Sequence, residues 1–171
     1  MTNWKSYHQN GTKYSLDHLH SNEIRYTPLG NPHGPVREYA IIISYSHHCF
    51  TRACRNNENP KPDEWYSHPT DRRVFDHDRY RYSQKLPELF LSIHEKQIWH
   101  SGQGNFLTVE MLTAKAVHCT YAVYFKLGQG KRGRGDLYLF VQSAYPRMDN
   151  PTPKKRRIRF QVLANDTFHG V

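Results

Sequence analysis

The side chains of this chain that can do chemistry are concentrated between Tyr45 and Tyr82. The segment reads YSHHCFTRACRNNENPKPDEWYSHPTDRRVFDHDRYRY and is rich in histidine, cysteine, aspartate and arginine. Histidine is the side chain whose unperturbed pKa lies near neutrality, and the planar fork of arginine matches a phosphate group. The segment therefore indicates chemistry on a phosphodiester, or capture of one.

Metal-independent cleavage of RNA is the reaction that these side chains suit best. It needs a base for the ribose 2′-hydroxyl, an acid for the leaving oxygen, and cations or hydroxyl donors around the phosphate. We expect His48 or His47 to act as the base, because both follow an apolar run. The candidates for clamping the phosphate, or for orienting and protonating the substrate, are Arg52, Arg73, Arg79, Ser143, Tyr145 and Arg147.

A zinc site is an alternative use of the same histidines and cysteines. The segment holds enough ligand types for a tetrahedral site, but it has no CysXXCys pair. His47 and His48 point to opposite sides if the preceding strand continues through them, so both cannot easily bind one ion. The sequence therefore predicts no metal and no cofactor, and a zinc-supported interaction domain remains a third hypothesis.

The aspartates of the segment allow two interpretations. Asp71, Asp76 and Asp78 lie close together in the sequence, as the ligands of a metal-dependent nuclease do. Arginines lie between and beside them, which favours a surface network of ion pairs.

The composition indicates a polyanionic partner. The 171 residues include 24 lysines and arginines against 15 aspartates and glutamates, a formal charge of +9. Basic clusters neutralise phosphates, and tyrosines, of which the chain has 12, offer surfaces on which unpaired bases stack. We therefore expect nucleic acid as the partner, with RNA preferred to DNA. Outside the segment described above, the candidate nucleic-acid-binding residues are Lys131, Arg132, Arg134, Arg147, Lys154, Lys155, Arg156 and Arg157, joined by Arg73 within it.

The rest of the composition indicates a cytoplasmic protein. No apolar run approaches the roughly 18 residues that span a bilayer, so no membrane contact is expected. The start of the chain lacks the apolar core of a signal peptide. The cysteine count is odd, which argues for reduced thiols, and Cys49 and Cys119 suit buried apolar positions better than nucleophilic ones.

The elements that must position these residues form one α+β domain with an antiparallel sheet of about five strands and one main covering helix. We predict a polar arm over residues 1–22, a domain over 23–171, and a long loop over 47–82. The helix is expected at 84–94, with Ser83 as its N-cap. The strands are expected at 37–46, 105–111, 117–126, 136–145 and 156–164.

The run LYLFVQSAYP (residues 137–146) and the basic strand expected after it resemble the closing strands of toxin ribonucleases of the barnase, EndoU, colicin and RelE-like superfamily. The resemblance covers the last third of the chain. It implies a helix-backed antiparallel sheet, metal-free RNA cleavage, and catalytic side chains at strand ends, where His48, Ser143 and Tyr145 would lie. The chain also resembles small proteins of phages and mobile elements, which implies a role in conflict or regulation.

Two functions follow from these observations. The first is a metal-independent endoribonuclease of toxin or defence type, with an antitoxin or inhibitor protein as a possible partner. The alternative is an accessory protein of a phage or mobile element that binds nucleic acid or a nucleoprotein without catalysis.

Overall fold

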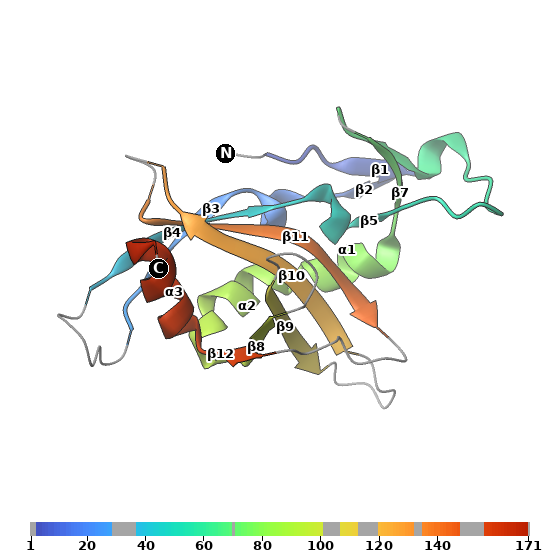
Figure 1. Cartoon of the computed structure of the whole chain (residues 1–171). Coiled ribbons are helices and arrows are strands. Elements are labelled where there is room, and N and C mark those ends of the chain that lie inside the picture. Colours follow the sequence, from blue (N-terminus) through green and yellow to red (C-terminus); the bar gives the residue numbers. More distant parts are fainter. Residues whose placement is uncertain are drawn as a thin grey trace.

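The computed structural model of the chain describes residues 3–28, 37–69, 71–100, 107–112, 120–131, 135–147 and 156–170, with the backbone alone for residues 107–112 and 120. These residues form an α+β fold in which one large sheet carries most of the core (Figure 1). Its strands are β3 (Asn22–Tyr26), β4 (Tyr39–Tyr45), β8 (Ile98–His100), β9 (Leu107–Leu112), β10 (Thr120–Gln129), β11 (Leu137–Arg147) and β12 (Arg157–Ile158).

The strands lie in the order β12-β8-β9-β10-β11-β4-β3. Every neighbouring pair is antiparallel except β11 and β4, which are parallel. β4 has the sequence YAIIISY, whose β-branched residues favour a strand, and six of its seven residues are buried. It pairs with β11 as far as Val141, and β11 then continues to Arg147 alongside the chain that follows β4. The carboxyl end of β11 therefore lies beside the histidine pair.

Two helices cover one face of this sheet, α2 (Leu86–Leu91) and α3 (Phe160–His169). Phe90 of α2 packs between Tyr45 and Phe125, with ring centroids 6.2 and 5.8 Å away. Phe160 of α3 meets the ring of Tyr26 edge to face at 5.0 Å. Tyr26 pairs with Tyr39, which shares a strand face with Tyr45, so both helices lie on the same side.

A second group of elements lies at the other end of the molecule from α3 (Figure 1). It comprises β1 (Tyr7–Gln9), β2 (Thr12–Tyr14), β5 (Thr51–Arg52), β6 (Trp65–Ser67), β7 (Arg72–Phe75) and α1 (His77–Ser83), with short 3-10 turns η1 (Asp17–Leu19), η2 (His47–Cys49) and η3 (Pro62–Glu64). A further 3-10 turn, η4 (Ile93–Glu95), follows α2 and contacts α3. Asn10 and Gly11 have φ angles of 49° and 74°, and such a pair favours the tight turn that joins β1 to β2. Tyr7 of β1 stacks on Phe75 of β7 at 3.9 Å, which ties the hairpin to the small sheet.

The α+β class predicted from the sequence is confirmed, but the finer architecture differs. The main sheet has seven strands and one parallel pair where about five antiparallel strands were expected. Three α-helices are described where one main helix was expected. The predicted loop at 47–82 contains strands β5, β6 and β7 and the helix α1.

Two of the expected elements are wrong in detail. Residues 156–164 were expected to form a strand, but only Arg157 and Ile158 do so, and α3 follows. Phe160, Ala164 and Phe168 recur at helical spacing, and Gly170 ends the helix with a φ of 73°. The helix expected at 84–94 is α2 followed by η4, and Ser83 is the last residue of α1 and not an N-cap.

The first residues of the chain contribute to the core. Trp4, Tyr7, Leu16 and Leu19 are buried, so the segment predicted as an arm is packed on the rest of the protein through apolar side chains. Within the described part of the chain, no helix combines the length and apolar character that a membrane span requires.

Candidate functional site

The histidine pair lies where β4 ends and η2 begins. The hydroxyl of Ser46 accepts a hydrogen bond from the His48 backbone N–H at 3.2 Å, and the backbone N–H of Ser46 donates to the carbonyl of Val141. The chain therefore turns immediately after the strand. The expectation that His47 and His48 point to opposite sides is wrong, because the strand does not continue through them. Their rings lie 4.6 Å apart, and both approach Asp71.

Asp71 is the centre of this histidine cluster. His47 Nε2 lies 2.5 Å from Asp71 Oδ1, and His48 Nε2 lies 3.8 Å from Asp71 Oδ2. Burial would raise the pKa of Asp71, but the His47 hydrogen bond and the charge of Arg73 outweigh it and lower the pKa. Burial lowers the pKa of His47, against the effect of its bond to Asp71. Both lowered pKa values are consistent with a neutral His47 that donates a hydrogen bond to an ionised Asp71.

His48 is the more accessible imidazole, since 28% of its side chain is exposed against 9% for His47. Its pKa is lowered to about 4, first by burial and then by the charge of Arg73. His48 is therefore neutral at pH 7 and a weak proton acceptor there. A general base works best with a pKa near the working pH, which counts against a strong catalytic role in the free protein.

Arg79 links three parts of the chain from α1. Its Nη1 donates to the backbone carbonyls of His48 and Thr51, at 2.9 and 2.8 Å. Its guanidinium lies 4.7 Å above the ring of Tyr145, and its Nε lies 4.0 Å from Asp76. Only 19% of the side chain is exposed. We infer that Arg79 holds η2, β5 and β11 together, a role different from the phosphate clamp expected from the sequence.

The other two expected clamps are also held in ion pairs. Arg52 lies 2.5 Å from Glu58 and 3.7 Å from Asp76, and Arg73 lies 3.6 Å from Asp71. Together with Arg79, they set three arginines against three carboxylates. Arg55 also lies 3.7 Å from Glu58, so the network holds four arginines and three carboxylates. Asp71 and Asp76 take part in these ion pairs, in line with one of their two interpretations.

Two tyrosines stack beside the network. Tyr145 of β11 and Tyr124 of β10 have ring centroids 5.7 Å apart and planes inclined by 23°. The Tyr145 hydroxyl donates to that of Tyr124 at 3.5 Å, and Arg147 Nη1 donates to the same oxygen at 3.2 Å. Burial and then the bond to Tyr124 raise the pKa of Tyr145 to about 12. We call Tyr124, Tyr145 and Arg147 the tyrosine platform.

Strand register explains this arrangement. Tyr124 pairs with Ser143, and a bulge between Tyr124 and Phe125 shifts the alignment of β10 and β11. Ser143, Tyr145 and Arg147 alternate along β11 and therefore share a face, with Tyr124 beside them. Ser143 therefore lies on the same side as the platform, but within β11 and not at its end, where it was expected.

The other basic candidates that the structure describes lie away from this site. Lys131 is exposed after β10, and Arg156 and Arg157 lie at β12, four strands from β11 in the sheet order. Arg132, Arg134, Lys154 and Lys155 lie outside the described residues. Among the described basic candidates, Arg73 and Arg79 are the ones whose charges act directly on the histidine pair.

Among the described residues, one group of side chains has the ligand types and spacing for a metal ion. Atoms of His47, His48 and Asp71 all lie within 4.8 Å of one another, and the ring of His68 stacks on that of His47 at 4.4 Å. Two imidazoles and a carboxylate suit zinc or iron. Arg73, however, places a guanidinium 3.6 Å from the carboxylate, and this charge opposes a divalent cation.

The comparisons with known proteins place the whole arrangement in a family. A model of the YjaZ family matches residues 6–168. The chain belongs to the YjaZ family. It is 27% identical over 164 residues to Protein YjaZ of Escherichia coli (strain K12), a match that covers 94% of this chain and 88% of that protein. No solved structure matches the chain.

Sequence reasoning missed the roles of two residues of this site. Asp71 was considered as a ligand of a metal-dependent nuclease or as an ion-pair partner of arginines, and its contact with both histidines was not predicted. Tyr124 was not singled out, because one tyrosine among many in a strand carries no local signal. Its register opposite Ser143 becomes visible only when β10 and β11 are aligned.

Proposed function

We propose that this YjaZ-family protein binds single-stranded RNA on the tyrosine platform. The observation that supports the proposal best is the convergence of Tyr124, Tyr145 and Arg147 with Arg79 and His48 at the end of β11. Aromatic side chains on a sheet stack unpaired bases, and arginine beside them pairs with phosphate.

Charge supports the same partner. Most charges of the ion-pair network are neutralised within it, so long-range attraction rests mainly on the formal +9 of the whole chain. Arg147 supplies a cation on the tyrosine platform. Arg73 and the exposed side of His48 lie in the histidine cluster around Asp71. RNA is preferred to duplex DNA because stacking on the rings requires unpaired bases. Free thiols at Cys49 and Cys54 fit a reducing compartment, and we place the activity in the cytoplasm.

RNA cleavage is the second candidate function. It is favoured by one observation, a neutral and partly exposed imidazole at His48 with Arg73 beside it. The pKa of about 4 makes His48 a weak base in the free protein, which is why binding ranks first. A bound phosphate would raise that pKa, because an anion favours the charged imidazole. The likeness to toxin ribonucleases stays a prediction.

The experiment is a titration of the protein into fluorescein-labelled octauridylate in EDTA, followed by anisotropy. We expect log Kd to depend linearly on log salt concentration, with a slope of about 0.7 for each phosphate contacted. Tyr124→Ala should weaken binding about fivefold or more, since a base stacked on an aromatic ring contributes about 1–3 kcal/mol. Tyr138→Ala, at the other end of β11, is the matched control and should leave Kd unchanged.

The same incubation distinguishes binding from cleavage. Products with a 2′,3′-cyclic phosphate that disappear in His48→Ala would establish the second candidate. Intact RNA with salt-dependent binding would support the first. Absence of both, at low salt and high protein concentration, would exclude the proposed function.

A further inference from the structure

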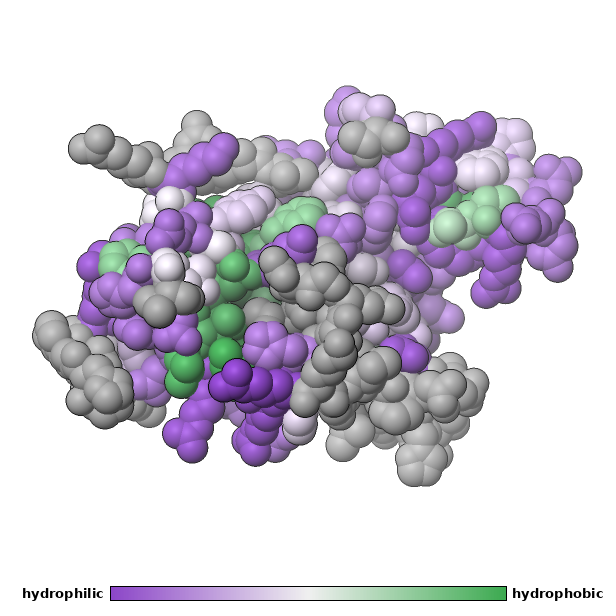
Figure 2. All heavy atoms as spheres, viewed as in Figure 1, coloured by the Kyte–Doolittle hydropathy of each residue, from purple (hydrophilic) through white to green (hydrophobic). Residues whose placement is uncertain are grey.

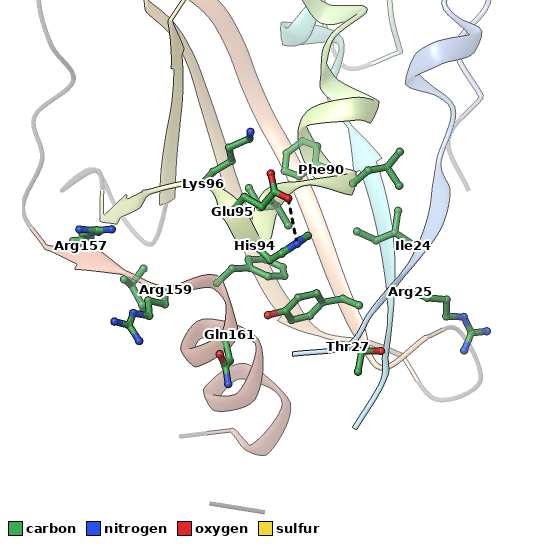
Figure 3. Close-up of a pocket in the computed structure, with 15 residues that line it drawn as sticks. Ile24, Arg25, Thr27, Phe90, His94, Glu95, Lys96, Arg157, Arg159 and Gln161 are labelled. Carbon is green, nitrogen blue, oxygen red and sulfur yellow. Dashed lines mark ion pairs between the residues drawn. The ribbon is translucent and has the colours of Figure 1, made fainter. Parts of the chain in front are cut away.

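A pocket lies between the two edge strands of the main sheet, β3 and β12, and not at the strands that carry the tyrosine platform. It has a volume of about 450 Å³ and is lined by β3, by α2 and η4, and by β12 with the start of α3 (Figure 3). β3 and β12 are the first and last strands of the sheet order, so each has a sheet neighbour on one side only. The sheet is therefore curved enough to bring both edges to one pocket.

The floor of this edge pocket is apolar. Phe90, Ile93 and Phe160 line it and are each at most 1% exposed, while Leu91 is 65% exposed at its margin. Figure 2 shows hydrophobic surface gathered next to α3 and hydrophilic residues around it. Leu91 is therefore the apolar side chain that the edge pocket exposes to a ligand, above a buried apolar floor.

The rim of the edge pocket is basic. Figure 3 shows Arg157 and Arg159 on one side and Ile24 and Arg25 on the other, with Glu95 between them. Arg25 is neutralised by two glutamates, at 2.8 and 3.4 Å, and Glu95 lies 3.8 Å from His94.

Three cations of the rim lack such a counter-charge within the described part of the chain. No ion pair of Lys96, Arg157 or Arg159 occurs among the described residues, and the first turn of α3 carries no acidic side chain. A ligand that covers the apolar floor would therefore meet three positive charges. Its own charge must be negative to complement them.

We propose that the edge pocket binds an acidic, extended segment of a partner protein. An apolar side chain of the segment would cover Leu91 and the floor, its carboxylates would face Lys96, Arg157 and Arg159, and its backbone would lie beside an open sheet edge. Extended peptides bind sheet edges in this way, with backbone hydrogen bonds for affinity and side-chain pockets for specificity. RNA fits less well, because Tyr26 and Phe160 are buried edge to face and present no open ring for a base.

The test uses a fluorescein-labelled peptide, EDVFVDE, and two matched peptides, KKVFVKK and EDGSGDE. We expect the first to bind the wild-type protein and the other two to bind at least tenfold more weakly. The triple variant Lys96→Gln, Arg157→Gln, Arg159→Gln should weaken binding of EDVFVDE at least tenfold. The control variant Lys5→Gln, Lys13→Gln, Lys131→Gln has the same net charge and changes exposed side chains elsewhere.

Equal effects of the two triple variants would overturn the proposal, because the attraction would then depend only on net charge. Displacement of the peptide by octauridylate would also overturn it, by identifying the edge pocket as a polyanion site. Leu91→Ser provides a second check that does not alter charge, and since Leu91 is exposed the variant should fold. An unchanged Kd for EDVFVDE in Leu91→Ser would contradict the apolar contact. The inference is independent of the proposed RNA binding.

Discussion

Replacing Arg79 by methionine tests whether this arginine is a structural link or a ligand-binding group. Methionine keeps most of the side-chain volume and removes the charge and the donors. Two hydrogen bonds from Nη1 would be lost, leaving the carbonyls of His48 and Thr51 without their donor. Hydrogen bonds to charged groups contribute about 1.5–3 kcal/mol each, and the contact over the Tyr145 ring about 0.5–1 kcal/mol. Allowing for partial relaxation, we expect a loss of about 3–5 kcal/mol.

Such a loss is a large share of the roughly 5–15 kcal/mol that stabilises a typical protein. Urea unfolding followed by circular dichroism measures it, and the melting temperature should fall by about 6–20 °C. The matched control is Arg81→Met on the same helix, whose exposed ion pair with Asp78 should contribute less than about 1 kcal/mol. A cost below about 1 kcal/mol for Arg79→Met, together with weakened RNA binding, would refute the structural role and restore the clamp expected from the sequence.

Three further predictions concern the histidine cluster and the thiols. The pKa of His48 is about 4 in the folded chain and about 6.5 in the unfolded chain, so the unfolded state binds more protons between these pH values. The free energy of unfolding should therefore fall by about 2 kcal/mol from pH 6.5 to pH 4, and by less in His48→Gln. Urea titrations at each pH measure this difference. Burial raises the pKa of the Cys49 thiol to about 12, which makes this thiol unreactive in the native protein. In a Cys119→Ser background, Ellman's reagent should therefore label Cys54 alone, and labelling of two thiols would contradict this. Elemental analysis of the purified protein should find no stoichiometric zinc, whereas one zinc per chain that is lost in Asp71→Asn would establish the metal site.

The fold was predictable where a local pattern decides the structure. The apolar, β-branched run that forms β4 specifies a buried strand without help from the rest of the chain. The segment around Phe160 was not predictable in this way, because the basic run before it suits a charged edge strand and the helical spacing spans only a few residues. The parallel pairing of β11 with β4 depends on contacts between distant segments, which no window of sequence contains.

The candidate site was likewise predictable from the sequence only in part. Residue types predicted which side chains can handle phosphate, and the structure brings His48, Arg73, Arg79 and Tyr145 into one cluster. Their roles depend on geometry that the sequence does not contain. The turn at η2 directs both histidines to Asp71, and hydrogen bonds to backbone carbonyls make Arg79 a structural link.

Photocrosslinking with an octanucleotide that contains 4-thiouridine is the sharpest test of RNA binding on the tyrosine platform, because it identifies the peptides that contact the bases. After digestion with trypsin, we expect crosslinks on the peptides of residues 116–126 and 135–147, which contain Tyr124 and Tyr145. These crosslinks should be lost in the double variant Tyr124→Ala, Tyr145→Ala and retained in Tyr138→Ala. Crosslinks confined to other peptides, or unchanged in the double variant, would contradict RNA binding on the tyrosine platform.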